Sequence, residues 1–562
     1  MKYANWNVPE RGAEIPRALL AAGCTPLLAA ILHLRGLSDP AAARSFLRGG
    51  AETLTNPLEL TGMVDAVQRL TRAVATGEHV AVYGDYDVDG ITAACLLTDY
   101  LRFRGLTCEL RIPDRISEGY GLNTAAIDAL AEEGVTLIVT VDCGVTNLEE
   151  TAYAAQRGVD MIVTDHHECR EALPEAEAVV DPKQPDSSGV GTALAGVGVA
   201  FKLVCAMDGD ADKMLARYGD LVAVGTVADV MPLLGENRFI TRCGLQKIAA
   251  GDCRPGFLAL AEEAGVRDKP FTASTVGFSL APRINAAGRL GEPSLAVRLL
   301  EEADLRRARV LAAELCAKNR ERQALEMEIW REAVERLHGE QPDAPIVLAS
   351  EGWHPGVIGI VASRLTDAYS VPAVMICLDG ESGKGSCRST GSFNLFEALS
   401  ACSDCLEGFG GHAMAAGVTV RRGCVDELRS RLREYYLSHP DRTLPALEAD
   451  LLIDSPELLT MACVESLDEL EPCGNGNPRP LLYMENVSLD SVQPIGGGKH
   501  LRLKLAKFGQ TYDGVFFSQT APALGARAGQ RCDIVFAPQI NEFHGRRSVQ
   551  LVITDLRRSK EG

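Results

Sequence analysis

The stretch that decides the fold runs from residue 79 to residue 90: His79-Val80-Ala81-Val82-Tyr83-Gly84-Asp85-Tyr86-Asp87-Val88-Asp89-Gly90. Its apolar first half predicts a buried strand, and residues 90–104 predict a helix. Further short apolar runs follow at 107–112, 136–142, 160–165 and 177–181, with helical segments between most of them. Short, continuously apolar strands that alternate with helices are typical of a doubly wound, parallel α/β sheet.

Acidic residues end four of these predicted strands: Asp85, Asp142, Asp165 and Asp181. Ligands of open α/β sheets bind outside the carboxyl ends of the strands, so we expect these acids to converge. Asp85, Asp87 and Asp89 would repel one another unless a cation lay between them. The segment Asp165-His166-His167 adds two imidazoles to these carboxylates. A mixed oxygen and nitrogen set of this kind suits Mn²⁺, or Mg²⁺ with more water ligands. Two such ions can activate a water at phosphorus, so the pattern predicts a metal-dependent phosphodiesterase.

The acidic cluster has two other interpretations, and the sequence disfavours both. The segment from Asp85 resembles the start of an EF-hand loop, but Leu96 stands at the twelfth position, where Glu is required, and a strand precedes the loop. A solvated acidic rim without metal is the second alternative. The alignment of the acids with successive strand ends disfavours it.

The motifs resemble those of the DHH phosphoesterase superfamily, and within it the single-stranded-DNA exonucleases. The resemblance covers nearly the whole chain. It rests in the first α/β unit on residues 83–90, 118–121, 141–144, 165–167, 196–200, 225–229 and 282–289, and in the second on residues 353–359, 385–389 and 410–417.

The resemblance implies a role for each matching residue. The implied ligands of two Mn²⁺ or Mg²⁺ ions are Asp87, Asp89, Asp142, His166 and Asp229, with Asp142 bridging the ions. His167 would face the scissile phosphate, and Asp165 would orient a histidine, which makes both of them catalytic together with Asp142. Asp85 and Asp165 would support the ligands. Tyr83 stands where some relatives have a histidine, which implies a weaker or more hydrated second metal site.

The implied substrate-binding residues are Arg115, Arg289, Arg388, Ser386, Gly411 and His412. The guanidinium fork suits phosphate, and the Gly410-Gly411 pair would let the backbone approach the substrate closely. Arg283 is a further candidate for a phosphate contact, with a surface salt bridge as its alternative.

The predicted organisation is an N-terminal helical segment at 1–75, a DHH catalytic domain at 76–293, a connecting helix at 294–340, a DHH-associated α/β domain at 341–440 and an OB-type β-barrel at 441–562. The connecting stretch could form one long helix or two joined helices. Strands predicted near 345–349 and 373–377 start the second α/β unit. The barrel is predicted from five short strands at 481–487, 500–507, 511–517, 531–537 and 548–555.

The chain carries a net charge of −20, which by itself disfavours nucleic-acid binding. However, residues 481–562 hold 11 Lys and Arg against 7 Asp and Glu, so the barrel is basic. Phe516, Phe517 and Phe543 could stack on bases. Alternating aromatic residues of this kind are more often buried in the core of a barrel. Cys402 and Cys405 are expected to be structural thiols, and residues 496–499 a hairpin turn rather than a nucleotide-binding loop.

The resemblance implies a 5′→3′ exonuclease that degrades single-stranded DNA to 5′-mononucleotides in DNA repair and recombination. It also implies single-strand-binding protein and a helicase as partners, and it predicts that the extra C-terminal domain of some relatives is absent. No secretory signal or membrane span is predicted, and the 17 cysteines fit a reducing cytoplasm. A hydrolase of short oligonucleotides and a catalytically inactive DNA-binding scaffold are the alternatives.

Overall fold

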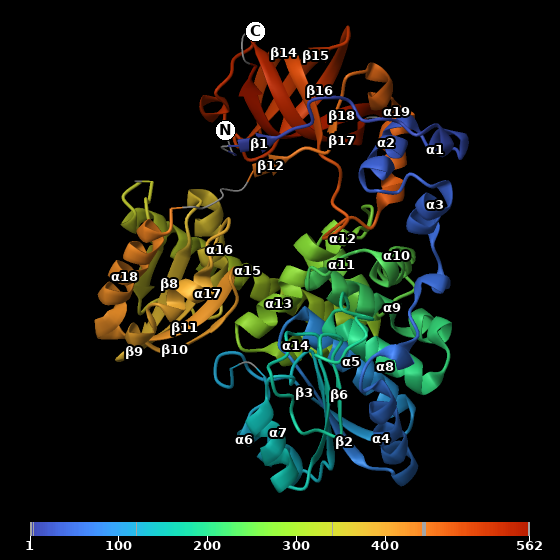
Figure 1. Cartoon of the computed structure of the whole chain (residues 1–562), viewed down its shortest axis with the longest axis vertical. Coiled ribbons are helices and arrows are strands. Elements are labelled where there is room, and N and C mark those ends of the chain that lie inside the picture. Colours follow the sequence, from blue (N-terminus) through green and yellow to red (C-terminus); the bar gives the residue numbers. More distant parts are fainter. Residues whose placement is uncertain are drawn as a thin grey trace. The chain divides into compact units, whose positions relative to one another are not determined.

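The computed structural model describes residues 3, 5–119, 121–339, 341–440, 446–543 and 545–559 (Figure 1). The chain divides into two compact units. One contains residues 51–442 and 474–476, and the other contains residues 1–50, 443–473 and 477–562. The segments at both ends of the chain thus belong to one unit, and the two α/β domains belong to the other.

A five-stranded parallel sheet forms the centre of the first α/β domain. Its order is β3-β2-β4-β5-β6, and the strands are β2 (His79–Gly84), β3 (Thr107–Arg111), β4 (Leu137–Val141), β5 (Asp160–Thr164) and β6 (Ala178–Val180). Helices α4 (Met63–Thr76), α5 (Val88–Phe103) and α8 (Gly196–Asp208) share a core with one face, and α6 (Thr124–Glu132) with the other. α7 (Leu148–Gln156) contributes Ala154 to that second core. The predicted doubly wound sheet is confirmed.

The strand order reverses between β2 and β4. The chain leaves β2 through α5 to reach β3 on one side, and it then crosses back to β4 on the other side of β2. Connections that leave a sheet in opposite directions open a crevice at the carboxyl ends of the two strands. The crevice lies where residues 84–90 and Asp142 follow their strands.

Helices complete the first α/β domain: α9 (Ala211–Ala228), α10 (Gly235–Ala250), α11 (Pro255–Glu263), α12 (Ala273–Thr275), a π-helical turn at Val276–Leu280 and α13 (Ala281–Arg289). The predicted connecting stretch forms two helices, α14 (Pro293–Glu301) and α15 (Leu305–Arg336). Asp304 starts α15 by accepting hydrogen bonds from the amides of Arg306 and Arg307.

The second α/β domain contains a mixed sheet with the order β10-β11-β9-β8-β7. Its strands are β7 (Ile346–Ser350), β8 (Ala373–Asp379), β9 (Ser382–Arg388), β10 (Leu406–Gly411) and β11 (Ala415–Arg421). Within this sheet, β7 and β8 pair in parallel, and the other described neighbours pair antiparallel. Helices α16 (Ile358–Tyr369), α17 (Leu395–Ser400) and α18 (Val425–Ser438) supply residues to its core.

A closed barrel forms the core of the other unit. Its strands are β14 (Leu482–Ile495), β15 (His500–Lys507), β16 (Gln510–Phe516), β17 (Arg531–Phe543) and β18 (Arg546–Arg558), and β14 pairs with β17 to close it. The predicted OB-type barrel is confirmed, and residues 496–499 form the turn between β14 and β15. Phe516 is buried in the barrel core, so it cannot stack on a base, whereas Phe517 and Phe543 are exposed.

The N-terminal segment expected at 1–75 is divided between the two units. Helices α1 (Arg17–Ala21), α2 (Pro26–Leu34) and α3 (Pro40–Arg48) share the hydrophobic core of the barrel. Strand β1 (Asn5–Asn7) pairs with β12 (Ala446–Glu448) in the same unit. In contrast, α4 packs on the parallel sheet through Met63, Ala66 and Leu70. No helix among the described residues is long and apolar enough to cross a bilayer.

Candidate metal centre and phosphate-binding cavity

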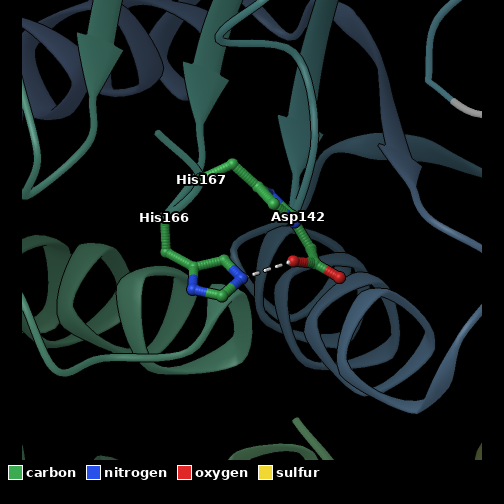
Figure 2. Close-up of side chains that lie close together, drawn as sticks. All are labelled: Asp142, His166 and His167. Carbon is green, nitrogen blue, oxygen red and sulfur yellow. Dashed lines mark ion pairs between the residues drawn. The ribbon is translucent and has the colours of Figure 1, made fainter. Parts of the chain in front are cut away.

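Seven carboxylate and imidazole side chains converge at the crevice beside β2 and β4. They form three overlapping groups whose ligand atoms lie within 4.8 Å of one another: Asp142, His166 and His167; Asp89, His166 and Asp229; and Asp85, Asp87 and Asp142. Nε2 of His166 lies 3.1 Å from Oδ1 of Asp142 (Figure 2). The same nitrogen lies 3.6 Å from Oδ2 of Asp229. All five predicted metal ligands are therefore brought together.

Helix ends hold the carboxylates in place. Asp87 caps α5, because its Oδ1 accepts hydrogen bonds from the amides of Asp89 (2.9 Å) and Gly90 (3.1 Å). Asp89 accepts hydrogen bonds from the first amides of α8, those of Gly196 (2.6 Å) and Val197 (2.9 Å). Asp229 is the C-cap residue of α9. Helix N-terminal amides favour negative charge, so the amides of Gly196 and Val197 partly offset the rise in the pKa of Asp89 that its burial causes.

Glycines allow the close packing that this arrangement requires. Asp142 has a φ of 59°, and a Cβ on Gly196 would lie only 2.5 Å from the Cβ of Asp142. A Cβ on Gly225 of α9 would lie 2.9 Å from Oδ1 of Asp89. Any larger residue at either position would displace a candidate ligand.

The donor atoms fit a divalent cation. Both ring nitrogens of His166 and Oδ1 of Asp142 are buried without a hydrogen-bond partner in the described part of the chain, although Nε2 and Oδ1 are close. Burial and the charges of neighbouring carboxylates raise the pKa of Asp89 and Asp142, and burial with Asp87 raises that of Asp229 to about 7. A bound Mn²⁺ or Mg²⁺ would satisfy these atoms and relieve the repulsion.

Asp165 holds His167 in a fixed orientation. Its Oδ1 lies 2.7 Å from Nδ1 of His167, and its Oδ2 accepts a hydrogen bond from the amide of Val145. Burial by itself would lower the pKa of His167, but the hydrogen bond and the charge of Asp165 raise it to about 9. The contact with Asp165 therefore favours the protonated form of His167 at neutral pH.

Asp85 has a more direct position than sequence reasoning assigned to it. Its Oδ1 is buried without a hydrogen-bond partner among the described residues, and it shares a potential metal site with Asp87 and Asp142. Burial and the charge of Asp87 raise its pKa to about 8. The position of Asp85 directly after β2 was the sequence signal for a ligand role, because the carboxyl ends of the strands converge in this sheet.

A cavity of about 670 Å³ adjoins the metal centre at His167. Four of the residues predicted to bind phosphate line it: Arg115, Ser386, Arg388 and Gly411. Tyr86 lies under Arg115, with the guanidinium carbon 4.9 Å from the ring centroid. The cavity thus places cationic side chains beside a candidate metal centre.

The other predicted substrate residues lie outside the lining of this cavity. Arg289 is nearby and donates a hydrogen bond to the carbonyl of Gly356 (3.1 Å), while His412 lies on the exposed turn between β10 and β11. Arg283 is not placed for phosphate, because it donates to the carbonyl of Ser279 and to Sγ of Cys316.

Sequence reasoning missed Arg322 of α15. Burial lowers the pKa of Arg289 to about 10, and the charges of Arg115, Arg322 and Arg388 contribute. Arg322 therefore belongs to the same cationic cluster, although it is buried and bonded to Asn319 and Glu326. Its position in a long, charged helix offered no sequence signal.

Three family models match successive parts of the chain. The DHH family N-terminal domain matches residues 79–226, the DHHA1 domain matches residues 327–437, and the RecJ OB domain matches residues 450–555. The matches coincide with the parallel sheet, the mixed sheet and the closed barrel. Together they cover most of the chain in the order that the structure shows.

Whole-chain relatives give the same result. The single-stranded-DNA-specific exonuclease RecJ of Bacillus subtilis is 40% identical over 94% of this chain and 68% of its own length. RecJ of Dickeya dadantii is 36% identical over 98% of both chains. The crystal structure of RecJ from Thermus thermophilus in complex with Mn²⁺ superposes with a TM-score of 0.85 at 31% identity, covering 99% of this chain and 80% of that one. A second structure of that protein contains Mg²⁺. The chain belongs to the RecJ family of the DHH superfamily.

Proposed function

We propose that this protein is a Mn²⁺- or Mg²⁺-dependent exonuclease that degrades single-stranded DNA from the 5′ end to 5′-mononucleotides, in DNA repair and recombination. The observation that carries the proposal is the convergence of five potential metal ligands at the switch point of the sheet, beside a cavity lined by Arg115 and Arg388. The relatives in this family are single-stranded-DNA-specific exonucleases by name.

The proposed metal ligands are Asp87, Asp89, Asp142, His166 and Asp229, with Asp142 common to two of the three groups. A divalent cation held by these residues would activate water and stabilise the charge that develops at phosphorus. Asp165 fixes the ring of His167, so that the imidazolium Nε2–H can donate a hydrogen bond to a phosphate oxygen. Asp165 itself is held by the amides of Val145 and His166, which keep its carboxylate from rotating.

Arginines bind the substrate strand in this proposal. Arg115 and Arg388 would hold the phosphate on the 5′ side of the scissile bond, because both line the cavity that begins at His167. Ser386 Oγ accepts a hydrogen bond from Arg388 (3.0 Å), which orients the guanidinium. Arg289 and Arg322 add positive charge without lining the cavity. The basic barrel would hold the strand farther from its 5′ end.

Cleavage assays test this proposal. Purified protein with Mn²⁺ should release labelled mononucleotides from the 5′ end of a single strand, and an intact duplex should resist. Asp142→Ala should reduce the rate by about 10³-fold or more, because Asp142 belongs to two of the three candidate ligand groups and would help to hold the cation. Release from the 3′ end, or cleavage confined to dinucleotides, would contradict the proposal. The second outcome would favour a hydrolase of short oligonucleotides.

We further propose that the protein acts in the cytoplasm together with a single-strand-binding protein and a helicase. A nuclease for single strands needs an activity that unwinds duplex DNA, and a helicase supplies it. Co-purification of either partner with the full chain tests this association. Loss of the partner on addition of competing single-stranded DNA would indicate that DNA bridges the two proteins, and retention of the partner would indicate a direct contact.

A further inference from the structure

One face of β9 extends beyond the phosphate-binding cavity. Alternate residues of a strand share a face, so Ser382, Lys384, Ser386 and Arg388 lie on one side, alternating with Gly383, Gly385 and the buried Cys387. Successive members of the polar row are about 7 Å apart along the strand. Ser386 and Arg388 line the cavity beside His167, and the row then continues away from the metal centre.

A second pocket of about 400 Å³ lies along this continuation. Its walls include Ile116, Pro355 and Lys384, which also line the phosphate-binding cavity, so the two spaces adjoin. Ile116 and Leu378 give it apolar surface, and Asp379, Ser382 and Thr419 give it hydrogen-bonding groups. The volume falls in the range of sites for small organic ligands.

Two charged groups of this second pocket have no partner in the part of the chain that the structure describes. Lys384, at the junction with the cavity, makes no ion pair or hydrogen bond through its side chain, and neither does Asp379 at the far end. The other carboxylate in the lining, Glu351, is paired with Arg422. These features match the parts of a nucleotide in order. Lys384 lies next to the phosphate site, apolar walls follow, and the carboxylate of Asp379 lies at the distal end.

We propose that the second pocket is a nucleoside subsite that takes the base of the 5′-terminal nucleotide and retains the 5′-mononucleotide after cleavage. The proposal rests on the proposed function, because it places the nucleotide's phosphate at Ser386 and Arg388. Lys384 would contact that phosphate from the pocket side. Asp379 would accept hydrogen bonds from the amino groups of cytosine, adenine and guanine. Thymine has no amino group, so it should fit least well.

Equilibrium binding of mononucleotides tests the subsite. The full chain with Mn²⁺ is titrated with each of the four deoxynucleoside 5′-monophosphates in a calorimeter. We expect thymidine monophosphate to bind about 3- to 10-fold more weakly than the other three, the range of one solvent-exposed hydrogen bond. Asp379→Asn should abolish this discrimination. Lys384→Gln should reduce the affinity for all four nucleotides by a similar factor.

Asp426→Asn is the matched control, because Asp426 is an exposed acid of the same domain that pairs with Arg429 on α18. It should leave all four affinities unchanged. Equal binding of the four nucleotides by the unchanged protein, or affinities that do not respond to Asp379→Asn and Lys384→Gln, would overturn the subsite. Lys384 and Asp379 are exposed, so both variants should fold, which the melting temperature verifies.

Cleavage of a 5′-labelled single strand by the same preparations separates this inference from the proposed function. If the unchanged protein cleaves the strand but its affinity for mononucleotides is independent of Asp379 and Lys384, the subsite is wrong and the function stands. If the expected binding pattern appears without cleavage of single-stranded DNA, the subsite is supported and the proposed function fails.

Discussion

The amide of Gly196 donates a 2.6 Å hydrogen bond to Oδ2 of Asp89, which joins the first turn of α8 to the first turn of α5. The two helices start at different strands of the sheet, and this bond fixes one carboxylate between them. A Cβ at residue 196 would also meet Asp142 at 2.5 Å. Gly196 is thus the point where two candidate ligands and a helix N-terminus come into contact.

Gly196→Ala should therefore impair the metal centre more than the fold. The added methyl must push Asp142 away, since backbone and Cβ atoms surround it. We expect Mn²⁺ affinity to fall by about 10- to 100-fold, with a loss of about 1–3 kcal/mol in stability from overpacking. Gly198→Ala, on the same helix, is the control, because its Cβ would meet only the flexible side chain of Leu194 at 3.1 Å. Equal Mn²⁺ affinity in the two variants would contradict the prediction.

Stabilisation by Mn²⁺ should depend on pH. Burial and the charge of Asp87 raise the pKa of Asp85 to about 8 and that of Asp229 to about 7. Because these folded-state values lie above those of the unfolded chain, the metal-free protein loses stability as the pH rises toward 8. A cation relieves this repulsion, and below pH 7 it must displace protons. The rise in melting temperature on adding Mn²⁺ should therefore be larger at pH 8 than at pH 6.

Asp142→Asn checks the origin of that effect. Removing one buried carboxylate should stabilise the metal-free protein at pH 8 and abolish most of the response to Mn²⁺. An undiminished response in Asp142→Asn would place the bound ion elsewhere. Thermal unfolding followed by circular dichroism, with and without Mn²⁺ at both pH values, provides the measurement.

The parallel sheet could be predicted from sequence because its strands are short, mostly apolar runs, and four of the five predicted strands end in an acid. Predicted strands at 79–85 and 160–165 correspond to β2 (His79–Gly84) and β5 (Asp160–Thr164). The division of the N-terminal segment could not be predicted. Amphipathic helices such as α3 and α4 have an apolar face, but the pattern does not state which core that face joins.

The candidate metal centre was predictable to the extent that its residues follow strands or match a motif. Asp229 lies at the end of a helix and was reached only through the family resemblance. The family resemblance gave Asp85 a supporting role, and spacing alone does not reveal which carboxylate oxygen lacks a hydrogen bond. Arg322 gave no signal, since its approach to Arg289 depends on how α15 packs against α13.

Two adjacent phenylalanines of the barrel should respond differently to substitution. Phe516→Ala should reduce stability by about 3–5 kcal/mol, because Phe516 is 4% exposed in the barrel core. Phe517→Ala should leave stability nearly unchanged, since its ring is 54% exposed and contacts His500 edge to face at 5.5 Å. If Phe517 stacks on a base, its loss should weaken binding of single-stranded DNA by about 1–3 kcal/mol. Fluorescence anisotropy with a labelled oligonucleotide distinguishes the two effects.

An ion-pair cluster at the amino-terminal ends of β2 and β5 should make the free energy of unfolding fall at acidic pH. Nη1 and Nη2 of buried Arg69 donate to Glu78, and Nε and Nη2 donate to Asp160. Burial by itself would raise the pKa of Glu78, but the hydrogen bond and charge of Arg69 lower it below the ordinary 4.5. The stabilisation from Glu78 is therefore complete above about pH 4.5 and is lost as the pH falls through the lowered value.

Glu78→Gln should consequently reduce the free energy of unfolding by about 1–3 kcal/mol at pH 7, because it leaves a buried guanidinium with one charged partner fewer. The difference between the variant and the unchanged protein should shrink as the pH falls from 4.5 through the lowered pKa of Glu78, because protonation removes the same charge. Asp343→Asn, which breaks the exposed pair with Arg433, is the control and should have no measurable effect at either pH. Urea unfolding of the metal-free protein at pH 7 and pH 4 tests both statements. A difference that stays constant with pH would show that Glu78 contributes by packing rather than by its charge.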